Sequence, residues 1–90
     1  MRRKKLVNEI TQFCLEYQVF EKTVNVDEVK AKIEIMLDDI AFIEILFNTI
    51  IRRAKKHDYF DVERLKKMLV EIEKIRLNLE YENINKLDKA

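Results

Sequence analysis

Few side chains in this sequence could carry out covalent chemistry or hold a metal. His57 is the only histidine and Cys14 the only cysteine, and the chain has no serine, glycine or proline. A zinc site takes about four ligands, so we predict no metal centre and no cofactor. Without glycine the chain can form no phosphate-binding loop, and without serine it can form no Ser-His-Asp triad. The composition therefore excludes the common nucleotide-dependent enzymes and the serine hydrolases.

One pair of carboxylates has the spacing of a helical site. Glu34 and Asp38 are four residues apart, which puts both on one face of a helix. A di-iron bundle would also need Glu-x-x-His on two helices, and the sequence has no such pair. Because both carboxylates lie off the apolar seam of their helix, we interpret them as part of a solvated face.

Cations concentrate between residues 52 and 67. Seven Lys and Arg residues there face three acids, a local charge of +4 in a chain whose net charge is +1. Such a cluster can neutralise phosphates, so it is a candidate contact with nucleic acid. The candidate contact residues are Arg52, Arg53, Lys55, Lys56, Lys66 and Lys67. A solvated helix end is the other interpretation, since no helix-turn-helix spacing accompanies the cations.

The same stretch contains the string Arg-x4-His-x-Tyr, formed by Arg52, His57 and Tyr59. The string resembles the motif of HEPN-type ribonucleases, helical dimers in which such an Arg and His meet near the dimer interface. The resemblance implies metal-independent RNA cleavage, with Arg52 stabilising the phosphate and His57 handling protons. It covers eight residues of the ninety, and Arg53 stands where the family usually has Asn or another small polar residue. A cationic helix end followed by a turn would also produce this string.

Three amphipathic helices are expected to position these side chains. In the middle of the chain, apolar residues recur at alternating steps of three and four, a heptad seam that predicts one helix over 26–56, with a bend near Asp38 and Asp39 left open. The seam consists of Val26, Val29, Ile33, Met36, Ile40, Ile43, Phe47, Ile50 and Ala54. Apolar stripes on either side predict helices over about 3–19 and from about 61 to 81 or 84, with a first connection over 20–24. Asn25 is the predicted N-cap of the central helix, and Asp58 or Asp61 that of the last one.

The predicted fold class follows from these stripes and from the composition. Leu, Ile, Glu and Lys dominate, which favours helix, and the absence of Gly and Pro leaves little turn chemistry for hairpins. Short connections make sequential helices antiparallel neighbours. We therefore predict an all-α fold over 1–90 as a single domain. Its three helices form an antiparallel arrangement with a long central helix, which assembles as a dimeric helical bundle.

The predicted dimer interface lies in the second half of the central helix. Between Ile40 and Ile51 only three residues are polar, so this segment needs cover on nearly all sides. The first helix reaches only about residue 42, and the third helix covers one side. A second copy is the expected cover for the other side. The predicted interface residues are Phe42, Ile45, Leu46 and Thr49.

These features favour binding over catalysis. The single cysteine fits a reducing compartment, and no apolar run of secretory or membrane-spanning length is present. We predict a small cytoplasmic protein that acts by protein–protein interaction, as a homo-oligomeric adaptor or regulator. Its partner would be a second copy or another helical protein, with no membrane and no small-molecule substrate. The alternatives are a nucleic-acid-binding accessory protein that uses the 52–67 stretch, and a HEPN-like ribonuclease.

Overall fold

The computed structural model describes residues 2–20, 25–59 and 61–88. Within them it contains four α-helices: α1 (Arg3–Glu16), α2 (Val26–Leu37), α3 (Ile40–Lys56) and α4 (Val62–Asp88). The described residues form no strand, so the predicted all-α class is confirmed. Most of the predicted first connection, residues 21–24, lies outside the described residues.

The predicted long central helix is wrong, because residues 26–56 form two helices that meet at a pair of aspartates. Asp38 ends α2, and the backbone of Asp39 is extended, with φ −128° and ψ 122°. The Asp39 carboxylate accepts the backbone N–H of Ala41 at 2.9 Å and that of Phe42 at 3.4 Å. It thereby satisfies two amides that have no partner inside the helix, as an N-cap does. The three-helix arrangement is therefore replaced by four helices.

The other predicted helix starts agree with the structure. Asn25 caps α2, with its side-chain oxygen accepting the N–H of Asp27 at 2.9 Å. Of the two candidates for α4, Asp61 makes the capping bond, to the N–H of Arg64 at 3.0 Å. Asn and Asp side chains accept hydrogen bonds from the backbone N–H groups of the first helical turn, which have no partner inside the helix. These residues therefore favour the position at which a helix begins.

Two helices end in a left-handed residue although the chain has no glycine. Gln18 (φ 50°) follows α1, and Asp58 (φ 49°) follows α3. The residue after each one donates its N–H to the carbonyl five positions earlier, at 3.0 Å in both cases, which is the Schellman motif. A positive φ costs a non-glycine residue roughly 1–2 kcal/mol. The two motifs turn the chain sharply at the ends of α1 and α3.

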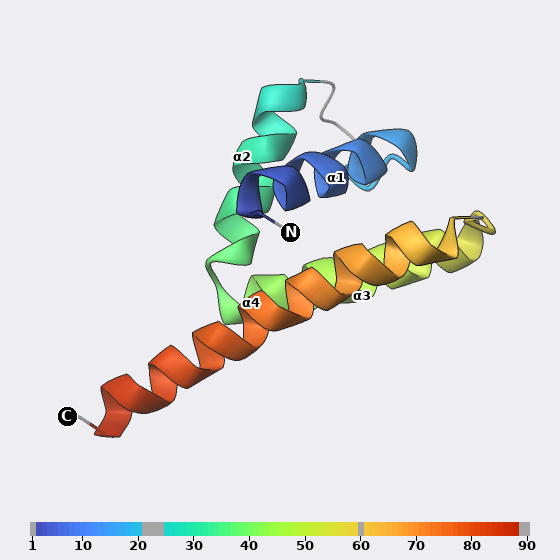
Figure 1. The fold of residues 1–90 in the computed structure, drawn as a ribbon. Coiled ribbons are helices and arrows are strands. Elements are labelled where there is room, and N and C mark those ends of the chain that lie inside the picture. The colour runs from blue at the N-terminus through green and yellow to red at the C-terminus, as the bar shows by residue number, and fades with distance from the viewer. Residues whose placement is uncertain (1, 21–24, 60, 89–90) are drawn as a thin grey trace.

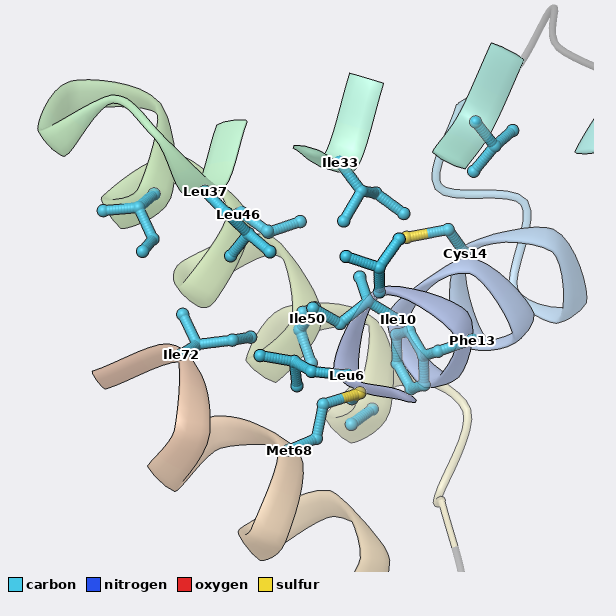
Figure 2. Packing of buried hydrophobic residues seen from close by; sticks show 14 residues of the cluster. Leu6, Ile10, Phe13, Cys14, Ile33, Leu37, Leu46, Ile50, Met68 and Ile72 are labelled. Atoms are coloured by element: carbon cyan, nitrogen blue, oxygen red, sulfur yellow. The ribbon is translucent and has the colours of Figure 1, made fainter. Parts of the chain in front are cut away.

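The four helices share one apolar core. α1 packs against α2 and α3 against α4, and contacts of α2 and α1 with the second pair join the two halves. Figure 2 shows the labelled core side chains from all four helices directed into one cluster. The core consists of Leu6, Val7, Ile10, Phe13, Cys14, Val29, Ile33, Leu37, Ile43, Leu46, Ile50, Ala54, Met68 and Ile72. Most seam residues are in it or packed against it, so the seam does identify the buried face of α2 and α3.

The end of α4 projects from this core. Figure 1 shows α4 continuing past the start of α3, away from the other helices. The Cα radius of gyration is 13.9 Å, against about 12 Å for a compact chain of this length. The chain exposes 6579 Å², whereas a compact monomer of 10.9 kDa exposes about 5,600 Å². The molecule therefore exposes roughly 1,000 Å² more surface than a compact monomer of its mass.

Candidate interaction surface

The predicted interface residues divide between the surface and the core. Phe42 is 47% exposed, Ile45 is 53% exposed and Thr49 is half-buried. Leu46 is only 1% exposed and belongs to the core of its own chain, so its assignment to the interface needs correction. One residue on a helix corresponds to a rotation of about 100°. Leu46 consequently points into the bundle while Ile45 points away from it.

Phe42 and Ile45 form a groove together with residues of α2. We call it the α2–α3 groove; it has a volume of about 330 Å³ and is lined by Lys32, Ile35, Met36, Phe42 and Ile45. The break at residues 38 and 39 brings the end of α2 beside the start of α3, so residues far apart on one straight helix become neighbours. Ile35 is the most exposed of the four apolar side chains, at 64%. In the sequence, Ile35 is distinguished only as an apolar residue that lies outside the heptad seam.

The same face of α3 continues into a cationic groove. Thr49, Arg52, Arg53 and Lys56 line this second groove, of about 260 Å³, which we call the basic groove. Residues spaced by three or four share a helix face, so this face of α3 runs from apolar in its first half to cationic in its second.

The structure thus brings together three of the six predicted nucleic-acid contacts. Lys55 instead lines a different groove beside Tyr59 and Leu65, between the end of α3 and the start of α4. Lys66 and Lys67 are exposed on α4. The basic stretch of the sequence is therefore distributed over two helices and more than one surface.

His57 lies in an aromatic cluster at one end of the bundle. It is the C-cap of α3, and its ring centroid is 5.1 Å from that of Tyr17. Tyr59 lies 5.6 Å from the rings of both Phe13 and Tyr17, and burial raises the pKa of its phenol. Arg52, five residues before His57, points about 140° away around the helix axis. Within one chain the two residues of the HEPN-like string therefore do not share a face, and a common site would require two chains.

The protruding part of α4 carries a second exposed apolar stripe. We call residues 77–85 the α4 extension. Leu77, Tyr81 and Ile84 follow each other at steps of four and three and are 51%, 67% and 57% exposed. Val70, one heptad earlier, is 52% exposed. These residues widen the apolar stripe of the sequence, but none of the helices in the described ranges covers them.

Ion pairs organise the base of the α4 extension. Arg76 bonds to Glu73, and its Nη1 lies 2.6 Å from Oε1 of Glu80. The hydrogen bond from Arg76 lowers the pKa of Glu73. Arg76 and Glu73 line one groove with Glu44 and Phe47, which places this turn of α4 beside the first turns of α3. Beyond this turn, Figure 1 shows α4 continuing past the start of α3.

Comparison with protein-family models, with curated proteins and with solved structures found no match for this chain.

The remaining candidate residues are placed as follows. Glu34 and Asp38 are exposed, and Asp38 pairs with Arg3 at 2.8 Å, in agreement with a solvated face. Across the described ranges, no three His, Cys, Asp or Glu side chains gather in the way a metal ion would need. In the same residues, no helix combines the length and the apolar character required to cross a bilayer. Cys14 is buried in the core, and burial raises the pKa of its thiol to about 12.

Proposed function

We propose that this protein acts by protein–protein interaction and that its first partner is a second copy of itself. The observation that supports this proposal is the α2–α3 groove, in which Ile35, Phe42 and Ile45 stand largely exposed beside one another. Burying a large apolar side chain contributes roughly 1.5–3 kcal/mol. Contiguous exposed apolar side chains of this kind are typical of interaction sites.

The surface area supports the same proposal. The chain exposes roughly 1,000 Å² more than a compact monomer of its mass. A standard specific interface buries about 800 Å² on each partner. If two copies associate, the surface area that each chain exposes would fall to about that of a compact monomer of its mass.

The proposal predicts that Phe42→Glu weakens self-association. A carboxylate in the α2–α3 groove would have to be desolvated on association, so we expect the dissociation constant to rise at least tenfold, or about 1.4 kcal/mol. Sedimentation equilibrium at micromolar concentrations measures this constant, starting from a chain of 10.9 kDa. Glu34→Lys, which changes an exposed residue on the solvated face of α2, is the matched control and should leave the constant unchanged. A wild-type protein that stays monomeric at tens of micromolar would refute the proposal.

Nucleic-acid binding is the second candidate function, and the basic groove supports it. Arg52, Arg53 and Lys56 line one groove and could contact up to three phosphates. The logarithm of the binding constant should then fall with the logarithm of the salt concentration with a slope of about −2 to −3. We expect Arg52→Ala, Arg53→Ala and Lys56→Ala together to abolish binding of a labelled oligonucleotide, as measured by fluorescence anisotropy at low salt.

Two lysines of α4 provide the control for this experiment. Lys66→Ala with Lys67→Ala removes cations that do not line the basic groove, and should have the smaller effect. Equal loss in both variants would point to unspecific attraction, and no binding at low salt would end the hypothesis. Cleavage of an RNA probe without metal, lost in His57→Ala, would instead support the HEPN-like activity.

A further inference from the structure

We infer that the α4 extension of one copy docks on the α2–α3 groove and the basic groove of a second copy, which docks its own extension in return. The inference rests on the proposed self-association and names the two surfaces that meet in it. Both surfaces are exposed in each chain, and neither is covered by the chain's own described residues.

The two surfaces match in kind and in length. Leu77, Tyr81 and Ile84 form an i, i+4, i+7 stripe, the pattern with which an amphipathic helix lies in an apolar groove. At about 1.5 Å per residue the stripe is about 10 Å long, and the face of α3 from Phe42 to Lys56 is about 21 Å long. The α4 extension therefore fits along this face with room for its flanking polar residues.

The charges of the two surfaces are complementary. The α4 extension, residues 77–85, carries two carboxylates and no Lys or Arg. The carboxylates are those of Glu80, which also pairs with Arg76 of its own chain, and Glu82. The receiving face carries three cations in the basic groove and Lys32 beside the apolar groove. Opposite charges placed across an interface fix its register and disfavour other pairings.

The two simpler symmetric pairings lack this complementarity. If two α4 extensions paired with each other, the acidic flanks of both copies would meet. If two α3 faces paired in antiparallel fashion, the basic groove of each copy would lie on the apolar half of the other, and its cations would lose water without gaining a partner. The exchange of extensions avoids both penalties.

The exchange also closes the assembly. Two equivalent contacts around a two-fold axis cover both exposed surfaces of each chain, whereas docking without return would leave one of each open and extend into a filament. A closed dimer of this kind accounts for the excess of roughly 1,000 Å² per chain, since the groove and the α4 extension are both exposed in the single chain.

Mixing two variants tests the inference. The groove variant carries Phe42→Glu and Ile45→Glu, and the extension variant carries Tyr81→Glu and Ile84→Glu. All four side chains are exposed, so both variants should retain their helical circular dichroism and cooperative unfolding. In a homodimer of either variant, each of the two extension-to-groove contacts includes a substituted surface. We therefore expect the dissociation constant of each variant to rise about a hundredfold or more. In an equimolar mixture, the intact extension of the first variant meets the intact groove of the second. Heterodimers should therefore form, and sedimentation with a fluorescent label on one variant detects them.

Every other result contradicts the exchange. An extension variant that still dimerises alone would place the contact between two α3 faces, and a groove variant that still dimerises alone would place it between two α4 extensions. Failure of the mixture to associate, while the wild type is dimeric, would also overturn the inference. A monomeric wild type would refute the proposed self-association itself, whereas the three preceding results would contradict only the exchange of extensions. Asn78→Glu adds one carboxylate to the α4 extension off the apolar stripe, and should change the wild-type constant by less than about threefold.

Discussion

Leu46→Glu is expected to unfold the chain rather than to separate a dimer. Leu46 is 1% exposed and lies in the core among side chains from the other helices (Figure 2). A carboxylate there would be buried without a described cation to pair with it, and such a substitution typically costs more than about 4 kcal/mol. That is a large part of the roughly 5–15 kcal/mol by which a small domain is stable.

Thermal unfolding followed by circular dichroism measures this loss. For a domain of this size, 1 kcal/mol shifts Tm by about 4–8 °C, so a fall of more than about 15 °C is expected. Phe42→Glu, one helical turn earlier on α3 but 47% exposed, is the matched control and should shift Tm by only a few degrees. A Leu46→Glu variant that melts like the wild type and is merely monomeric would return Leu46 to the interface predicted from the sequence.

The Cys14 thiol is expected to make the protein sensitive to alkaline pH. Burial raises its pKa from 9.0 to about 12 in the folded chain, and Figure 2 shows it among the core side chains. Between pH 9 and pH 12 the unfolded chain loses the thiol proton while the folded chain keeps it. The associated stability is thus fully present below pH 9 and is lost as the pH rises towards 12. A shift of this size corresponds to about 4 kcal/mol in total.

Urea unfolding at pH 8 and pH 11 tests this prediction. Over that interval the wild type should lose about 3 kcal/mol more of its free energy of unfolding than Cys14→Ala does. Lysines and the other titrating groups, including Tyr17 and Tyr59, are present in both proteins and cancel in the comparison. Equal losses in the two proteins would mean that the thiol titrates alike in the folded and unfolded states.

Local features of the structure could be predicted from the sequence because they depend on neighbours along the chain. Asn25 and Asp61 cap helices because a short polar side chain reaches the amides two or three residues ahead. The seam predicts the buried face of α2 and α3, since side chains three and four apart share a helix face whatever the helix packs on. The same reasoning predicts the all-α class, which the four observed helices confirm.

The position of the apolar surfaces was harder to predict because it depends on the break at Asp38 and Asp39. The heptad steps continue across these two residues, so periodicity alone indicates one helix. The predicted antiparallel arrangement would have laid the last helix back along the central one. Once α2 turns away from α3, the later part of α4 has no other described helix beside it, and Tyr81 is 67% exposed.

The sequence by itself determined the helical class, the caps and the buried stripes of this protein. Only the tertiary structure decided that Leu46 belongs to the core while Ile35 and Phe42 share a groove. A stripe on a helix says which side chains avoid water, but not which neighbour covers them. The angle between helices determines which neighbour covers a stripe. Here the extended backbone and the cap at Asp39 allow α3 to begin in a different direction from α2. The surfaces proposed to bind a second copy are those that this change of direction leaves uncovered.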